Sequence, residues 1–483
     1  MDKTQLDALL AGKLEIPFAQ CTLTQRGTST PIVYEGAGLL MQDADRNLRL
    51  RLLVQYVPAH EAIQRHLFRP FVPGVIVPEP EYYDLVATDL TGTEWVAERL
   101  SLSTNFGTAG TYMEATPWHI DKREKVQRVP EASAIQAFLR DDIPLPWHVF
   151  TRQGEFGGRM DVFSSDVAGL SWHVRKKDDG VELTFTAKHG PLQRHIERFL
   201  RAFSILVGRD IRPMVAVMTD GDLRVTRLQG RHLASEKAQM VTPLKLDTPL
   251  ADARDAHAFL ACCMTDSIDA DRDSADHSEL MYRSWHRILR ASKGDIENSS
   301  LVLSVAIEGM IKAAFLCDHD ADDDFQAQVA EARPRLKAVE LPDRVRQCVQ
   351  SSLGNAVRPR VQDVLKRLIK QGAISQVHLD AWKGLRHAAA HGELFLADSD
   401  PAMQAHLNRF HCCLDLFYRL VFVIVRYRGK HVDLSSPGWP EAPFPPVVPS
   451  GVHLAGSQSA ISVAAPEGGL GMSDQPPRLE LGT

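Results

Sequence analysis

The period of the hydrophobic pattern changes near residue 250, and this change limits the folds open to the chain. Before it, apolar and polar residues alternate, as over 31–41 and 47–54, which is typical of half-buried strands. After it, apolar residues recur every three or four positions, which is typical of amphipathic helices. The sequence therefore predicts an α+β fold with two domains, a β-rich N-terminal domain over residues 1–245 and an all-α helical bundle over residues 250–436.

The same patterns bound individual elements. Further strands are expected over 94–102, 160–174, 181–187, 214–218 and 223–228. One helix, 192–207, interrupts the β-rich domain. Eight more helices are expected in the bundle: 252–264, 278–291, 299–317 (capped by Ser299 and Ser300), 324–332, 342–353, 360–371, 375–391 and 401–427. Residues 437–483 are rich in proline and glycine and are expected to be largely disordered.

Composition excludes several functions. The 483 residues hold 55 Lys and Arg against 61 Asp and Glu, so no chain-wide basic field marks a nucleic-acid binder. The seven cysteines are odd in number and form no CxxC motif, which favours structural cysteines in a reducing compartment. The most apolar run, Leu420 to Val425, is far shorter than the roughly 20 residues of a membrane span. We therefore expect a cytoplasmic protein without a membrane segment.

The candidate functional site lies at the end of the seventh predicted helix of the bundle, where residues 382–392 read WKGLRHAAAHG. Spacing alone decides nothing, because Arg-x4-His occurs four times in the chain, at Arg227/His232, Arg272/His277, Arg386/His391 and Arg426/His431. The third pair is distinguished by its setting on a strongly predicted helix. Two apolar anchors, a polar neighbour of the arginine and a helix stop surround it: Trp382, Leu385, His387 and Gly392.

These residue types suit RNA cleavage without a metal or another cofactor. Histidine serves as base and acid because its pKa lies near neutrality. A base removes the proton of a ribose 2′-hydroxyl, which attacks the adjacent phosphate, and a guanidinium stabilises the phosphorane oxygens. The end of a helix favours the protonated form of His391. Two copies that meet at a symmetric dimer interface would give a fuller site.

Two other interpretations of this segment remain open. Arg386 and the two histidines can be an ordinary polar helix end. His387 and His391 also form an HxxxH pair, which binds zinc when further ligands join it, although the central glutamate of HExxH is absent.

The segment 382–392 resembles the Arg-x4–6-His motif of HEPN domains, in which Asn, Asp or His commonly follows the arginine. Residues from about 250 to 436 are similar to the ApeA-like HEPN domain of bacterial anti-phage proteins, and the β-rich half is similar to their N-terminal domain. The resemblance implies a metal-independent endoribonuclease of antiviral defence that acts in abortive infection. It also implies a homodimer through the HEPN helices.

The resemblance assigns roles to single residues. Arg386 and His391 would be catalytic, and His387 would be the polar auxiliary. Glu308, on an earlier helix, would orient Arg386; alternatively it is a solvated helix residue. Glu393 stands where HEPN toxins paired with nucleotidyltransferases carry a tyrosine, which argues against that subgroup.

The helix expected over 360–371 is basic and is a candidate for contact with the RNA backbone. The candidate RNA-binding residues are Arg360, Lys366, Arg367, Lys370 and Lys383. A solvated helix face is the alternative. We expect the β-rich domain either to sense a phage-derived trigger or to hold RNA, and the sequence is compatible with both roles. A non-catalytic module, in which the bundle dimerises and the β domain binds a partner, is the competing function.

Overall fold

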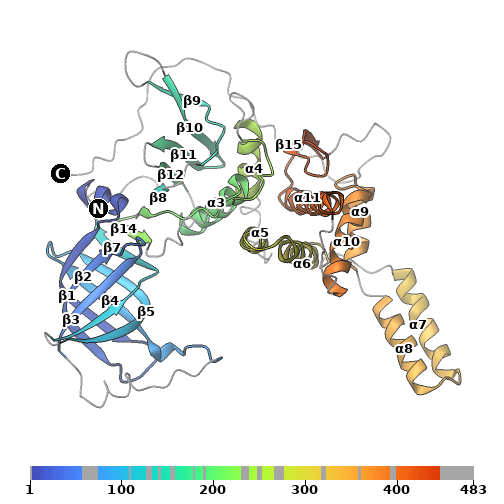
Figure 1. Cartoon of the computed structure of the whole chain (residues 1–483), viewed down its shortest axis with the longest axis horizontal. Helices are drawn as coiled ribbons and strands as arrows, with labels where there is room; N and C mark the ends of the chain where they lie inside the picture. Colours follow the sequence, from blue (N-terminus) through green and yellow to red (C-terminus); the bar gives the residue numbers. More distant parts are fainter. Residues whose placement is uncertain are drawn as a thin grey trace.

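The computed structural model places a β-rich region before a helical region, which confirms the α+β fold class (Figure 1). The structure describes residues 3–56, 74–107, 110–126, 133–139, 143–152, 158–177, 180–188, 192–229, 239–246, 253–265, 277–316, 323–356, 360–391 and 399–445. Of the segment 437–483 that was predicted to be largely disordered, residues 446–483 lie outside the described residues, whereas 437–445 are described and include a strand at Glu441–Phe444. None of the described helices has the length and apolar composition to cross a bilayer.

Six described strands close into an antiparallel barrel in the order β4-β1-β2-β3-β6-β5, with β4 also paired to β5. Their bounds are β1 Glu15–Gln25, β2 Val33–Gln42, β3 Leu48–Tyr56, β4 Tyr82–Asp89, β5 Glu94–Gly107 and β6 Gly110–Ala115. Burial alternates along β4, because successive side chains point to opposite faces of a strand. The inward side chains fill the barrel, where the ring centroids of Phe18 and Trp95 lie 5.9 Å apart.

The sheet continues past the barrel from β5 through eight antiparallel strands, in the order β7-β14-β13-β8-β12-β11-β10-β9. Their bounds are β7 His119–Lys125, β8 Ser133–Leu139, β9 Val149–Arg152, β10 Gly158–Val167, β11 Leu170–Lys177, β12 Gly180–Ala187, β13 Val215–Asp220 and β14 Leu223–Gln229. Helix α3 (Leu192–Val207) packs on β8 and β12 and has the bounds expected from the sequence. A short helix, α1 (Lys3–Ala11), precedes the barrel.

The helical region contains all eight helices expected from the sequence, within a few residues at most ends. They are α4 Ala253–Thr265, α5 His277–Ala291, α6 Ile296–Ala314, α7 Asp323–Ala338, α8 Asp343–Ala356, α9 Val361–Lys370, α10 Gln376–His391 and α11 Asp400–Ile424. Helices α7 and α8 pack on each other as a hairpin that stands apart from the others (Figure 1). A two-stranded sheet, β15 (Gly429–Val432) and β16 (Glu441–Phe444), follows α11.

Two hydrophobic cores hold the described residues together, and they do not divide where strands give way to helices. One core fills the barrel and includes Phe18, Trp95 and Leu228. The other runs from β8, β10, β11 and β12 through α3 into the helices, and includes Trp172 and Trp285. The helices that carry the candidate site therefore share one continuous core with the second part of the sheet, which they reach through α3, α4 and α5.

Some local predictions were wrong, and the reasons are local. Residues 160–174 form two strands instead of one, because Ala168 and Gly169 adopt positive φ and turn the chain. Helix α6 begins at Ile296, and Asp295 caps it by accepting a hydrogen bond from the backbone N–H of Asn298 at 2.6 Å, so Ser299 and Ser300 are not the cap. Strand β1 and several shorter strands were also not predicted individually; in β1, Pro17 weakens the strand pattern.

Candidate active site

Helix α10 carries the candidate site and is fixed against α6 by its apolar face. Leu379, Trp382 and Leu385 are buried at helical spacing, as the sequence predicts for the last two. The indole Nε1–H of Trp382 donates a hydrogen bond to the backbone oxygen of Ser304 on α6, at 3.2 Å. The helix ends at His391, next to the predicted stop at Gly392, which lies outside the described residues.

Arg386 and Glu308 form the central contact of the site. Nε of Arg386 donates to a carboxylate oxygen of Glu308 across the α10–α6 interface, at 2.6 Å. Lys312, one turn further along α6, donates to the other oxygen at 2.7 Å. Partial burial alone would raise the pKa of Glu308, but the hydrogen bonds from Lys312 and Arg386 outweigh it and hold that pKa below its ordinary value. Glu308 is therefore a carboxylate at neutral pH.

The geometry leaves most of the Arg386 guanidinium available. The side chain of Glu308 is 18% exposed, whereas that of Arg386 is 41% exposed. Among the described residues, the contact to Glu308 through Nε is the one carboxylate contact that Arg386 makes. A guanidinium held at one edge can offer its remaining N–H groups to a phosphate.

The two histidines of the motif lie beside and beyond this arginine. His387 is exposed on the outer side of α10. His391 is the last residue of α10, and its side chain lies outside the described part of the chain. Lys383 and His387 are i,i+4 neighbours, and Lys383 is partly exposed on the same outer face.

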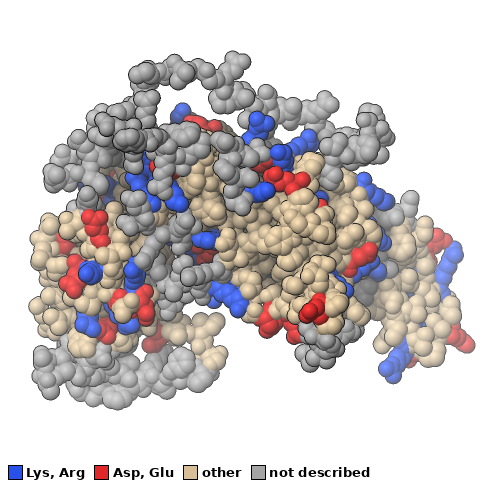
Figure 2. All heavy atoms as spheres, turned by 45° about the horizontal axis from the view of Figure 1, so that its top comes forward, with Lys and Arg blue, Asp and Glu red and all other residues tan. Residues whose placement is uncertain are grey.

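The basic residues predicted to contact RNA lie mainly on the outer face of α9. This helix turns Val361, Val364, Leu365 and Leu368 inward and packs against α6 and α10. Its outer residues Arg360, Lys366 and Lys370 are exposed, and Arg367 is half-buried. On the face drawn in Figure 2, acidic and basic side chains are interspersed over the surface instead of forming one broad basic field.

The other Arg-x4-His pairs differ in their described partners. Arg227 donates two hydrogen bonds to the carboxylate of Asp121, both at 2.8 Å, so its guanidinium is already engaged. His431 is buried, and its Nδ1 lies 2.8 Å from the backbone oxygen of Ala442. The pair at 272 and 277 falls partly outside the described residues. Arg386 thus differs from Arg227 in keeping its terminal N–H groups unpaired by described carboxylates.

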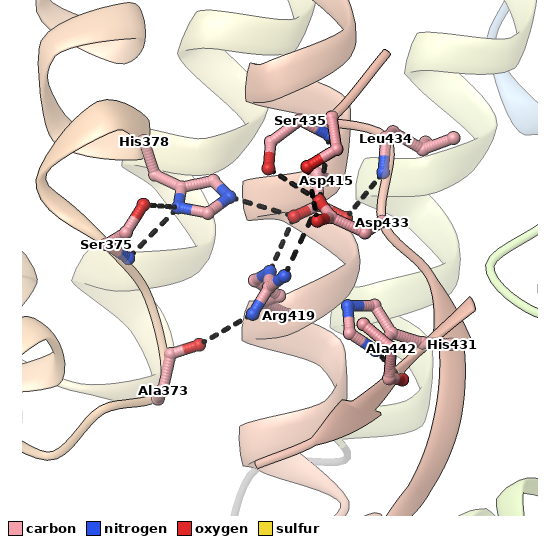
Figure 3. A network of polar contacts seen from close by, with 11 residues as sticks. Ala373, Ser375, His378, Asp415, Arg419, His431, Asp433, Leu434, Ser435 and Ala442 are labelled. Atoms are coloured by element: carbon pink, nitrogen blue, oxygen red, sulfur yellow. Dashed lines mark hydrogen bonds and ion pairs between the residues drawn. The ribbon is translucent and has the colours of Figure 1, made fainter. Parts of the chain in front are cut away.

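A buried polar network that was not predicted from the sequence fixes the start of α10 (Figure 3). Nε2 of His378 lies 2.8 Å from a carboxylate oxygen of Asp415 on α11, and Arg419 donates to the same oxygen at 2.5 Å. The backbone N–H of Leu434 donates to the second oxygen at 3.2 Å. His378, Asp415 and Arg419 are all almost fully buried. A signal was present, because Asp415 and Arg419 interrupt an otherwise apolar helix at i,i+4 spacing.

This network includes a Ser375–His378–Asp415 arrangement, but its protonation fits a structural role. The backbone N–H of Ser375 donates to Nδ1 of His378 at 3.0 Å, so this nitrogen is an acceptor and Nε2 carries the proton that goes to Asp415. The Ser375 hydroxyl lies 2.8 Å from the same nitrogen and donates to it as well, so Nδ1 accepts two hydrogen bonds from Ser375. The contact from the Ser375 backbone N–H to His378 is one half of a capping box, with histidine in the place of glutamate; in the other direction the backbone N–H of His378 donates to the backbone oxygen of Ser375.

The described residues contain no group of three or more His, Cys, Asp or Glu side chains placed to hold a metal ion. Of the His387–His391 pair, the side chain of His391 lies outside them. Comparison with protein-family models, with curated proteins and with solved structures finds no match to this chain.

Proposed function

We propose that the protein is a metal-independent endoribonuclease of the HEPN class that acts in anti-phage defence. The observation that carries the proposal is the Arg386–Glu308 pair, which presents an ionised, partly exposed guanidinium beside His387 on α10. Without a metal, a histidine can transfer the protons needed to form a phosphorane, and a neighbouring guanidinium can stabilise its negative charge. In this proposal the separately packed barrel senses a phage-derived trigger.

The reaction is a transesterification. His391 removes the proton of a ribose 2′-hydroxyl, and the 2′-oxygen forms a bond to the adjacent phosphorus. Arg386 stabilises the charge that gathers on the phosphorane oxygens. The bond from phosphorus to the 5′-oxygen breaks, and a protonated histidine supplies the proton to this leaving group. The products are a 2′,3′-cyclic phosphate and a 5′-hydroxyl.

A second copy of the chain can supply the second histidine. Leu301 and Val305 are 42% and 48% exposed on α6, and Glu308 and Lys312 continue the same face at helical spacing. An apolar strip beside the site suits an isologous dimer contact in which each protomer faces the other's α6. We therefore propose a homodimer through α6 and α10.

Cleavage is expected to persist in EDTA and to leave defined ends. Wild-type protein should cut unmodified RNA equally with and without EDTA, because the histidines transfer the protons and Arg386 stabilises the charge on the phosphorane, so no metal ion is needed. The 5′ ends should accept phosphate from polynucleotide kinase without prior phosphatase treatment. An RNA whose 2′-hydroxyls are methylated is the control and should remain intact, since it lacks the nucleophile. Cleavage that EDTA stops, or 5′-phosphate ends, would contradict this mechanism.

Glu308 is expected to act as a positioning residue for Arg386. Glu308→Gln removes the charge that holds the guanidinium and should lower kcat by about ten- to hundredfold, the cost of a small misplacement in a site. KM for RNA should change little. Lys312→Gln is the matched control, because Lys312 donates to the same carboxylate from α6 itself and its replacement leaves the Arg386–Glu308 pair in place. Equal losses in both variants, or a change confined to KM, would show that Glu308 does not position Arg386.

A further inference from the structure

A second arginine lies against the helix that carries the candidate site. Arg409 on α11 crosses α10 at Gly384, where a Cβ atom would lie 3.1 Å from both Cδ and Nε of Arg409. Glycine leaves this space open, so the arginine side chain can lie directly against the helix backbone. Arg409 is exposed, so the crossing takes place at the surface of the protein.

Helix geometry places Arg409 on the edge of α10 opposite Arg386. At about 100° per residue, Gly384 and Arg386 lie roughly 160° apart around the helix. Arg386 faces α6 and Glu308, whereas Gly384 faces α11 and Arg409. The outer face of α10, which carries His387, therefore has one guanidinium on each edge.

The charge of Arg409 has no described acidic partner. No carboxylate among the residues that the structure describes forms an ion pair with Arg409, whereas Arg386 is paired with Glu308. The charge of Arg409 also acts on buried His406. Loss of solvation is the main cause that lowers the pKa of His406, and the positive charge of Arg409 lowers it further. An exposed guanidinium beside a histidine-bearing face is suited to a phosphate group.

We propose that Arg409 binds a phosphate of the RNA backbone on the α11 edge of α10, so that the strand lies across the outer face of this helix. This inference rests on the proposed function and deepens it. An α-helix with its side chains is about 10–12 Å across, so Arg386 and Arg409 contact different phosphates. Arg386 stabilises the reacting phosphate, and Arg409 holds a neighbouring one.

Binding of an uncleavable RNA tests this assignment in the full chain. The probe is a fluorescein-labelled single-stranded RNA with methylated 2′-hydroxyls, titrated by anisotropy over a range of salt concentrations. Arg409→Gln should weaken binding about tenfold, and it should reduce the slope of log K against log salt by about 0.7, the value of one single-strand phosphate contact. Arg409→Lys keeps the charge and should keep most of the slope.

Two further variants separate this contact from folding and from general charge. Gly384→Ala places a methyl group against the arginine side chain and should weaken binding in the same direction. It should not lower Tm, because alanine favours a helix over glycine. Arg283→Gln removes an exposed arginine of α5 that pairs with Glu279, and it should change neither affinity nor slope.

Equal affinity and equal salt slope for Arg409→Gln and wild type would overturn the proposed phosphate contact, as would a wild-type protein that binds no RNA. Weaker binding by Arg409→Gln, together with no cleavage of unmodified RNA by wild type, would support the phosphate contact and reject the nuclease. Cleavage by wild type with unchanged binding by Arg409→Gln would reject the contact alone.

Discussion

His391→Ala is expected to abolish most RNA cleavage, with a loss of about a hundred- to ten-thousandfold, the range for a general acid or base. Arg386→Ala should lose about a hundred- to thousandfold, because it removes a group aimed at the charge of the transition state. Arg386→Lys should recover little of this, since a single ammonium does not reproduce the planar fork that binds two oxygens. Purified variants should be compared with wild type on total RNA, in EDTA, by the rate at which full-length species disappear.

A matched control exists elsewhere on the same chain. Arg426→Ala breaks another Arg-x4-His pair at an exposed position after α11, and it should cleave like wild type. The folded state of each variant is checked by its thermal transition. If wild type and His391→Ala cleave equally, the assignment of His391 is wrong.

The biological counterpart is phage plating on cells that express each variant. Wild type should reduce plaque numbers, and His391→Ala should restore them, if the nuclease carries the defence. Protection that survives both Arg386→Ala and His391→Ala would instead favour the competing function, a non-catalytic module that dimerises and binds a partner. Plating therefore separates two classes of function without knowledge of the RNA substrate.

Helices and strands whose apolar residues recur at a regular spacing could be predicted, because burying one face of an element requires that spacing. Helix α3 has the predicted bounds, since Leu192, Ile196, Leu200 and Phe203 repeat at helical spacing; three of these are buried and Leu200 is partly buried. Trp382 and Leu385 were predicted as anchors of α10 for the same reason. Strand β1 was missed because Pro17 weakens the pattern and a register shift between Phe18 and Cys21, where residues 19 and 20 are both exposed, interrupts its alternation.

Contacts between elements could not be predicted from spacing. Glu308 and Arg386 are 78 positions apart, so the local sequence pattern does not indicate that they pair; only the family resemblance suggested it. His378 and Asp415 are 37 positions apart, and neither residue type indicates a buried partner on its own. The crossing of Arg409 over Gly384 also depends on how α10 and α11 pack, because glycine within a helix has no side chain to mark the contact.

Asp415→Ala is expected to destabilise the larger core by about 3–5 kcal/mol, the cost of removing one partner of a buried ion pair. Asp415 is fully buried, and it accepts hydrogen bonds from His378, Arg419 and the backbone of Leu434. Its loss leaves the guanidinium of Arg419 with Asp433, 3.7 Å away, as its nearest acidic partner. Urea unfolding should report this loss in the transition of the helices, while the barrel, which has its own core, should unfold as in wild type.

The double variant Asp415→Asn with Arg419→Met separates the charge from the packing. Asparagine still offers an oxygen to His378, and methionine removes the cation that would otherwise be left buried. This pair should therefore be less destabilised than the two single changes added together. Asp380→Ala, an exposed acid of α10, is the control and should shift stability by less than about 0.5 kcal/mol.

The same network makes stability depend on acid pH. Burial would raise the pKa of Asp415, but the hydrogen bond from His378 and the charge of Arg419 outweigh it and lower that pKa in the folded state. A lowered folded-state pKa contributes stability above the unfolded value of about 4, and this contribution is lost as the pH falls through the folded-state pKa. Wild type should therefore lose stability on acidification below about pH 4, and Asp415→Asn should lose less over that range, because it has no carboxylate to protonate. A parallel decline of both proteins would place the acid sensitivity in other carboxylates and would weaken the case that this network fixes α10.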